Sequence, residues 1–255
     1  RSFSITVQNI APSDHFNTSI YNGSGASQSI TTGFAPDFTW IKSRSNGTWH
    51  CVADTVRGNL SRIFPNDTYQ QVTNNNGFLS FDSNGFNLDG QGGGGDVNTS
   101  GRTYVAWSLK AGGAAVANTD GIISTQVSAN TTLGFSVITY DGATNATADT
   151  SNNSGTYWNV AHGLGATPDL VLVKKTSGAG GWYVGGAALS STGSNGNHLA
   201  LNTTAAQVGE ANILWGGSQT FNATTFGIGG WDVVNRNGDS YLAYCFTSKP
   251  GMSKV

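Results

Sequence analysis

The sequence predicts an all-β protein built from two tandem antiparallel β-sandwich modules of the jelly-roll or lectin-like kind. Short runs rich in β-branched and aromatic residues are bounded by clusters of Gly, Asn, Asp and Ser, which supply turns. No apolar pattern with a helical period persists over three turns, and the chain has a single Glu, Glu210. Four segments also recur in the same order in the second part of the chain.

The strongest strand signals lie in six short segments. Each combines apolar, β-branched or aromatic residues with turn residues at both ends. Strands at such short spacing, without helices between them, imply antiparallel sheets. The six segments are residues 2–10, 38–42, 104–109, 135–140, 170–174 and 241–246.

An internal repeat predicts the domain organisation. The matching pairs are residues 16–23 with 135–142, 33–42 with 164–174, 85–86 with 225–226, and 98–107 with 235–244. We therefore expect one module over residues 1–113, a short linker over 114–119 and a second module over 120–255. In such a repeat Pro36 superposes on Pro168, and Tyr104 on Tyr241.

A Pro-Asp pair precedes one predicted strand in each module. Pro36 and Pro168 lack a backbone N–H, so they belong just before a strand and not within it. Asp37 and Asp169 follow them and are expected to accept hydrogen bonds from nearby backbone N–H groups. These are fold-making signals that need no substrate.

Composition and charge exclude several classes of protein. Only 10% of the 255 residues are charged and the net charge is −2, so no basic stripe could neutralise nucleic-acid phosphates. No apolar run approaches the roughly 20 residues that a membrane helix needs. The 27 aromatic residues (7 Trp, 8 Tyr and 12 Phe) argue against disorder. Because the chain begins at Arg1, we expect it to be processed or to be a segment of a longer protein.

Two cysteines and the glycosylation sequons leave alternatives open. Cys51 and Cys245 are expected to be buried free thiols, and a bridge between the modules is the alternative. Eleven Asn-x-Ser/Thr sequons would mean heavy glycosylation in a secreted eukaryotic protein. In a chain so rich in Asn, Ser and Thr, chance is the preferred explanation.

The pattern of residues resembles a domain that recurs in virion-associated proteins of tailed phages, often marine and cyanobacterial ones. The match is carried in the first module by residues 33–34, 36–38, 40–42, 44, 54, 57–58, 81–83, 85–86 and 101–110, and in the second by 134–142, 162–165, 168–169 and 174. The resemblance implies a lectin-like β-sandwich in a tail, fibre or capsid-associated protein on the surface of the extracellular particle. The second module lacks counterparts of Asp54 and Arg57, which puts a shared role for that pair in doubt.

Catalytic and metal sites have little support in the sequence. A glycosidase normally needs two carboxylates flanking the scissile bond, and here most Asp residues stand in turn contexts. The four His show no metal-ligand spacing, and His162 is expected to be hydrogen-bonded in a turn. Residues 89–96 lack the ending of a phosphate loop, while Asp82, Asn84 and Asp89 imitate a calcium loop only in part. We therefore expect no catalytic residue, no cofactor and no metal ion.

Aromatic residues outside the clearest strands are the best candidates for a binding site. Sugar rings stack on aromatic faces, whereas the alternative is that these rings fill small cores or subunit interfaces. Trp158 is also in this group. The candidate ligand-binding residues are Trp49, Trp182, Tyr183, Trp215 and Trp231.

Three functional hypotheses follow from these observations. The first is a non-enzymatic structural protein of the virion, either a capsid-decorating or a tail or fibre subunit, that associates with itself and with other virion proteins. The second is an adhesin that binds host surface glycans. The third and weakest hypothesis is an enzyme that acts on those glycans, because most of the Asp residues stand in turn contexts and the chain has one Glu.

Overall fold

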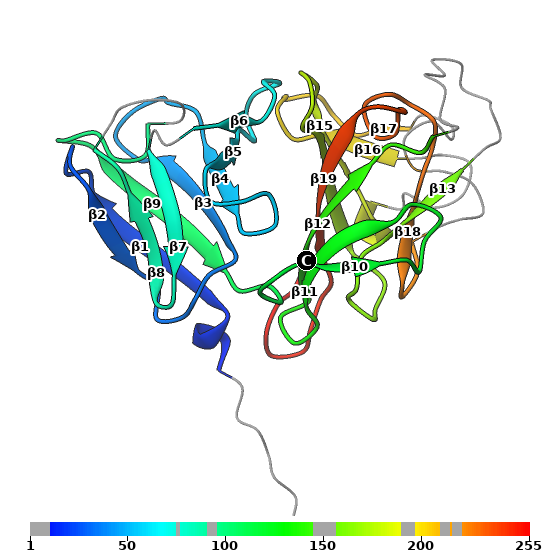
Figure 1. Cartoon of the computed structure of the whole chain (residues 1–255), viewed down its shortest axis with the longest axis horizontal. Helices are drawn as coiled ribbons and strands as arrows, with labels where there is room; N and C mark the ends of the chain where they lie inside the picture. Colours follow the sequence, from blue (N-terminus) through cyan, green and yellow to red (C-terminus); the bar gives the residue numbers. More distant parts are fainter. Residues whose placement is uncertain are drawn as a thin grey trace, which may run out of the picture.

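The computed structural model describes residues 11–74, 77–90, 96–144, 157–189, 197–209, 215 and 221–255. Within them the protein is all-β, with antiparallel sheets and two short 3-10 helices, η1 (Pro12–Asp14) and η2 (Ala187–Leu189) (Figure 1). The first half carries β1 (Phe16–Asn22), β2 (Gln28–Thr31), β3 (Phe38–Ser43), β4 (Cys51–Asp54), β5 (Ser61–Ile63), β6 (Val72–Thr73), β7 (Phe78–Asp82), β8 (Gly85–Leu88) and β9 (Thr103–Leu109). The second half carries β10 (Val116–Asn118), β11 (Thr125–Asn130), β12 (Phe135–Asp141), β13 (Trp158–Ala161), β14 (Leu170–Lys175), β15 (Trp182–Gly185), β16 (Asn197–Ala200), β17 (Val208–Gly209), β18 (Thr225–Ile228) and β19 (Ser240–Phe246).

The first half forms one large and one small sheet. The large sheet has the order β1-β9-β3-β4-β5-β6, and the small one has the order β2-β8-β7. Because side chains alternate along a strand, Ile41 of β3 and Tyr104 of β9 point to one face of the large sheet. There they join Phe78, Phe86 and other residues of the small sheet in a buried apolar core.

The second half repeats this plan with a longer large sheet. Its order is β10-β11-β12-β19-β14-β15-β16-β17, and β13 and β18 form the small sheet. Val171 and Val173 of β14 face a core that also contains Trp158, Phe226 and Trp215. In Figure 1 the small sheet of the second half lies on the outer right.

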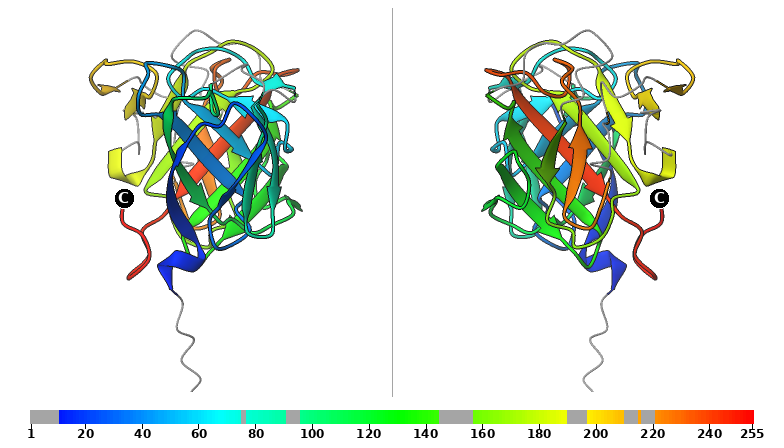
Figure 2. Two further views of the ribbon diagram at one scale, coloured as in Figure 1. Left: turned by 90° about the vertical axis from the view of Figure 1, so that its left-hand side faces the viewer. Right: turned by 90° about the vertical axis from the view of Figure 1, so that its right-hand side faces the viewer.

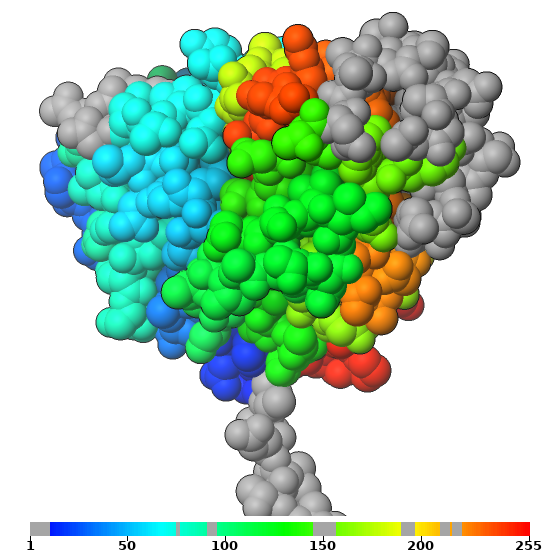
Figure 3. All heavy atoms as spheres, turned by 45° about the vertical axis from the view of Figure 1, so that its right-hand side comes forward, coloured from blue at the N-terminus to red at the C-terminus, as the bar shows by residue number. Residues whose placement is uncertain are grey.

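The two large sheets pack against each other through their remaining faces. Phe38 and Val52 of the first half share a core with Leu172, Trp182 and Tyr244 of the second. The strands of the two sheets cross obliquely in Figure 2. The halves meet along a continuous seam on the surface shown in Figure 3. The protein is therefore four layers deep, with a small sheet on each outer side and two large sheets between them.

Five of the six predicted strands are confirmed almost to the residue. They correspond to β3, β9, β12, β14 and β19. The sixth, over residues 2–10, lies outside the described residues. The segment expected as a linker over 114–119 differs, since it contains β10, which pairs with β11 and extends the second large sheet. Gly112 approaches the backbone of Ala129 too closely to leave room for a side chain, which fixes the chain as it enters the second half.

Six strands of the two large sheets correspond in order and register. The order β1-β9-β3-β4-β5-β6 corresponds strand for strand to β12-β19-β14-β15-β16-β17, with β10 and β11 added in the second half. Phe38 stands opposite Leu109 as Leu170 stands opposite Phe246. Tyr21 stands opposite Tyr104, and in the same positions Tyr140 stands opposite Tyr241. Pro36 and Pro168 each lie two residues before these β3 and β14 positions.

The tyrosine pairs make matching contacts in both halves. Tyr21 stacks on Tyr104 with ring centroids 5.2 Å apart, and Tyr140 stacks on Tyr241 at the same 5.2 Å. The Tyr21 hydroxyl donates to the carbonyl of Val97 at 2.8 Å, and the Tyr140 hydroxyl donates to that of Val234 at 2.8 Å. These contacts join β1 and β12 to the loops that precede β9 and β19, the last strands of the two halves.

Asp37 and Asp169 have the structural role that the sequence predicts. The Ala111 N–H donates to Asp37 Oδ2 at 2.8 Å, and the Ser248 N–H donates to Asp169 Oδ2 at 2.7 Å. Each carboxylate therefore holds the chain where it leaves the last strand of its half. These partners lie far along the sequence, so each hydrogen bond joins the start of one strand to the segment that follows the last strand of the same sheet.

Both cysteines are free and buried, as expected for small apolar side chains. Burial raises the pKa of the Cys51 thiol to about 11, against the smaller opposing effect of Arg62. Among the described residues, no helix is long and apolar enough to cross a membrane.

Candidate functional site

Two exposed aromatic rings form a platform on the first half. Trp49, in the loop between β3 and β4, is 41% exposed, and Tyr69, in the loop between β5 and β6, is 50% exposed. Their ring centroids are 6.1 Å apart and their planes are inclined by 32°. Trp49 rests on the buried ring of Phe64, with centroids 5.0 Å apart. We call Trp49 and Tyr69 the aromatic platform.

Hydrogen bonds fix the loops that carry this platform. The His50 N–H donates to Asn66 Oδ1 at 2.8 Å, which ties the Trp49 loop to the Tyr69 loop. The Tyr69 N–H donates to Asp67 Oδ1 at 2.7 Å. Asn66 is exposed and Asp67 is half-buried beside the rings. The arrangement therefore offers two apolar ring faces together with amide and carboxylate groups, a combination suited to a flat polar ligand such as a sugar.

Residues of the second half donate hydrogen bonds to the backbone near the aromatic platform. The indole N–H of Trp182 donates to the carbonyl of Phe64 at 2.9 Å. The Gly180 N–H and the Lys174 ammonium both donate to the carbonyl of Thr68, at 2.9 and 3.2 Å. Residues of both halves thus determine the position of the Tyr69 loop.

Two of the five predicted binding residues are not exposed. Trp182 and Trp215 are each 1% exposed, so their rings lie inside the protein. Trp182 stacks on Tyr244 in the core between the large sheets, with ring centroids 6.2 Å apart. Trp215 covers Gly185, where a Cβ would lie 2.4 Å from the indole ring. The expectation that these rings are available to a ligand is therefore corrected, because both fill cores.

Tyr183 and Trp231 form a separate half-buried pair on the second half. Their ring centroids are 5.5 Å apart, and both pack against the core between the large and small sheets of the second half. They do not join Trp49, so the structure brings none of the five predicted residues together except this pair. Trp158 is buried in the same core.

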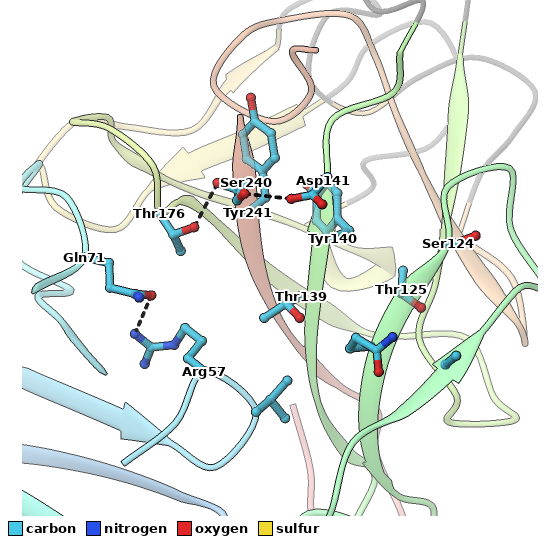
Figure 4. A pocket seen from close by; sticks show the side chains of 13 residues that line it. Arg57, Gln71, Ser124, Thr125, Thr139, Tyr140, Asp141, Thr176, Ser240 and Tyr241 are labelled. Atoms are coloured by element: carbon cyan, nitrogen blue, oxygen red, sulfur yellow. Dashed lines mark hydrogen bonds between the residues drawn. The ribbon is translucent and has the colours of Figure 1, made fainter. Parts of the chain in front are cut away.

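A polar cleft lies between the two halves. It has a volume of about 510 Å³. Figure 4 shows Arg57 and Gln71 of the first half facing Thr139 of β12 across it. At its upper end the Ser240 hydroxyl donates to Asp141 Oδ1 at 2.6 Å. The remaining lining residues are Val56, Ala117, Ser124, Thr125, Gln126, Tyr140, Thr176 and Tyr241.

A buried ion pair lies at the floor of this cleft. Arg57 Nε is 2.6 Å from Asp54 Oδ2, and both side chains are almost completely buried. The Tyr244 hydroxyl of the second half donates to the same Asp54 oxygen at 2.7 Å, and Arg57 Nη2 donates to that hydroxyl at 3.2 Å. Burial alone would lower the pKa of Arg57, but Asp54 and Tyr244 outweigh it and raise that pKa. Arg57 therefore stays charged, and the hydrogen bonds of the pair to Tyr244 join the halves.

A buried lysine also takes part in the contact between the halves. Lys174 Nζ donates to the carbonyls of Gly180 at 2.7 Å and Thr68 at 3.2 Å. Burial lowers its pKa to about 8, and the opposing effect of Asp67 is smaller. Near neutral pH the group therefore holds a proton that it releases more readily than an exposed lysine does.

Other side chains that the sequence offered for metal binding or catalysis accept hydrogen bonds from backbone N–H groups. The Asn84 N–H donates to Asp82 Oδ1, and the Gly90 N–H donates to Asp89 Oδ1, so these carboxylates shape turns. His162 accepts from the Leu164 N–H at 3.2 Å, which is the predicted turn interaction. Over the described part of the chain, no group of three or more His, Cys, Asp or Glu residues could hold a metal ion.

Sequence reasoning missed Tyr69, Phe64 and the cleft. Tyr69 follows Pro65, Asn66 and Asp67, a run that indicates a turn, and nothing in that run indicates that the tyrosine ring is exposed. The cleft arises from the packing of two halves, which no local pattern predicts. A glycine within a strand can mark close approach of another group, so Gly185 was the available signal for the buried Trp215.

Comparisons with known proteins give one match. No curated protein and no solved structure matches the chain. The family described as "Domain of unknown function (DUF7483)" matches residues 11–255, which is nearly the whole chain. The chain belongs to this family.

Proposed function

We propose that this chain is a non-enzymatic structural protein of a tailed-phage particle, built from two copies of one lectin-like β-sandwich module. In this role it covers part of the particle surface as a capsid-decorating, tail or fibre subunit, and it associates with itself and with other virion proteins. Repetition of one chain under symmetry is the usual way to build such surfaces.

One observation carries this proposal: residues of the internal repeat, among them the two aspartates that also belong to the phage-protein resemblance, make matching structural contacts in the two halves. Asp37 and Asp169 bind the N–H groups that follow the last strands. Asn98 Oδ1 accepts from the Ser24 N–H at 2.9 Å, and Asn235 Oδ1 accepts from the Ala143 N–H at 2.9 Å. Equal strand order and register support a tandem repeat. Residues used in this way serve a fold, which favours a structural role over catalysis.

Labelling of intact particles tests the proposal. An antibody raised against the purified chain is applied to phage particles whose genome encodes it, and the particles are viewed by electron microscopy. We expect the label on the particle surface at regular positions. The proposal fails if the chain is absent from purified particles by mass spectrometry, or if it releases new reducing ends from host polysaccharide.

Glycan binding is the second candidate function, and the aromatic platform favours it. Trp49 and Tyr69 present ring faces to solvent beside Asn66 and Asp67, which offer hydrogen-bonding groups. Stacking on such rings together with a few polar contacts is a common basis for recognising small polar ligands. A surface subunit with this platform would act as an adhesin.

A glycan array with matched variants tests this second function. Trp49→Ala and Tyr69→Ala should each reduce binding of any recognised glycan about fivefold or more, as loss of one aromatic contact costs roughly 1 kcal/mol or more. Ile122→Ala, which changes an exposed apolar side chain on the second half, is the control. No binding by the wild-type chain, or equal binding by all variants, would exclude the platform.

A further inference from the structure

Among the described residues, strand β1 forms an open edge of the first large sheet. It is the first strand in the order of that sheet, and its one described partner is β9, from Phe16 opposite Leu109 to Asn22 opposite Thr103. The equivalent strand in the second half, β12, pairs with β19 on one side and with β11 on the other. The same position in the fold is therefore covered by an antiparallel strand in one half and uncovered, within the described residues, in the other.

β1 lacks the features that normally protect an open edge. Natural edge strands are commonly short, bulged or charged. The other described edge strands are two to four residues long, apart from β7, which has a register shift after Phe78 and ends at Asp82. β1 has seven residues in unbroken register and carries no charged side chain and no proline. It is thus the edge most open to pairing.

The backbone groups on this edge belong to alternate residues. The Lys110 N–H donates to the His15 carbonyl and the Gly23 N–H donates to the Arg102 carbonyl, each at 2.8 Å. In an antiparallel ladder, hydrogen bonds to one neighbour come from every second residue, so the odd-numbered residues of β1 bond to β9. The N–H and carbonyl groups of Phe16, Thr18 and Ile20 therefore point away from the sheet.

An apolar stripe runs along the same residues. Ile20 is 65% exposed and Phe16 is 42% exposed, on either side of exposed Thr18. The stripe continues onto half-buried Val105 and Trp107 of β9, which face Ile20 and Thr18 across the ladder. In the second half, Phe135 and Val137 occupy the positions of Phe16 and Thr18, and both are buried in the core between the large sheets.

We propose that β1 pairs antiparallel with β1 of a second copy of this chain, with Thr18 opposite Thr18 and Phe16 opposite Ile20. This dimer rests on the proposed structural role and gives it an assembly contact. The pairing joins two large sheets into one continuous sheet across a twofold axis, which is an isologous contact.

A second copy suits this edge because the strand is complementary to itself. With Thr18 on the axis, each Phe16 lies beside the Ile20 of the other copy, so both exposed apolar side chains gain an apolar neighbour. The even-numbered residues of both strands supply the hydrogen bonds, and no charge is buried. β11 on β12 is the precedent within the same chain for an antiparallel strand at this position.

Cross-linking through a single engineered cysteine tests the register. Directly opposed residues in a hydrogen-bonded antiparallel pair have Cα atoms about 5.5 Å apart, which a disulfide can span. The full chain with Thr18→Cys should form a disulfide-linked dimer under mild oxidation, whereas Ile122→Cys, an equally exposed site on the other half, should not. The native cysteines do not interfere, because both are buried.

Sedimentation measures the strength of the same contact. The wild-type chain should form dimers as its concentration rises. Thr18→Lys places two like charges opposite each other and should weaken dimerisation about tenfold or more, while Thr18→Val keeps a β-branched side chain and should preserve it. Circular dichroism confirms that each variant is folded.

Three outcomes overturn the proposal. A wild-type chain that remains monomeric at all concentrations excludes the dimer, and so does equal cross-linking of Thr18→Cys and Ile122→Cys. If Thr18→Cys fails to cross-link in the full chain but cross-links once residues 1–10 are deleted, the occupant of the edge is that segment and not a second β1. Absence from purified particles would instead defeat the proposed function and leave the dimer measurement intact.

Discussion

The large sheets of the two halves share the order and register of six strands, but the halves differ where they face each other. Lys42 and Lys174 occupy equivalent positions, yet Lys42 is half-buried and bonds to the carbonyl of Thr48, whereas Lys174 is buried and also bonds to a carbonyl of the other half. Asp54 is replaced at its equivalent position by Gly186, whose φ of 132° and close approach to the Asp169 carbonyl leave no room for a side chain. The comparison teaches that the contacts within each half are alike, while the contacts between halves are asymmetric.

The largest expected effect comes from the ion pair that only the first half has. Arg57→Ala leaves the Asp54 carboxylate buried with Tyr244 and without its cation. Removal of one partner of a buried pair typically costs about 3–5 kcal/mol, and we expect a loss of that size in the free energy of unfolding by urea. The double variant Asp54→Ala/Arg57→Ala should recover part of it, because no charge remains buried. A loss below about 1 kcal/mol for Arg57→Ala would show that the pair does not join the halves.

The next prediction concerns the pH dependence of the free energy of unfolding, to which Lys174 should contribute because its pKa changes on folding. The pKa of Lys174 falls from 10.5 to about 8 on folding, so between these values the unfolded chain binds a proton that the folded chain has lost. The free energy of unfolding therefore rises with pH in this window, by about 1.5 kcal/mol over the first 1.5 pH units above pH 8. Well below pH 8 both states hold the proton and the slope from this group vanishes.

Lys174→Met should remove this rise, which urea unfolding across the window measures against wild type. All other titratable groups are the same in the two proteins, so the difference between their curves gives the contribution of Lys174. Lys42→Met removes the equivalent hairpin contact at the less buried site and serves as the matched control. Parallel curves for wild type and Lys174→Met would contradict the assignment.

The smallest effect compares the two turn aspartates. Asp37 is buried and accepts from the N–H groups of Ala111 and Gly113 and from the Thr55 hydroxyl, while Asp169 is half-buried and accepts from the Ser248 N–H. We expect Asp37→Ala to cost about 2 kcal/mol and Asp169→Ala about 1 kcal/mol of unfolding free energy. Any glycan binding should survive both changes. A larger loss for Asp169→Ala would mean that the halves depend differently on this contact.

The strands could be predicted from the sequence because their signals are local. Alternation of side chains and the turn residues around Tyr104 and Tyr241 placed five strands within a residue or two. The Pro-Asp pairs also predicted the role of Asp37 and Asp169, although their partners lie at the far end of each half.

The site could be predicted only in part, because burial depends on distant partners. Trp182 follows two glycines and reads as a loop residue, but β15 turns its ring into the core between the halves. Trp49 lies in a similar glycine and polar context and remains exposed, with one ring face on the buried Phe64 and the exposed Tyr69 beside it. Which tryptophan meets solvent is decided by the face on which the second half docks, and no single segment encodes that.

The last strand of each half lies in the interior of its sheet, β9 between β1 and β3, and β19 between β12 and β14. A nascent chain therefore cannot complete the first large sheet until β9 has left the ribosome, and the second large sheet cannot be completed until β19 has left it. Long-range pairing of this kind slows folding, so we expect folding in milliseconds to seconds. A premature stop before Ser240 would remove a central strand and leave β12 and β14 unpaired along one side, exposing the chain to aggregation.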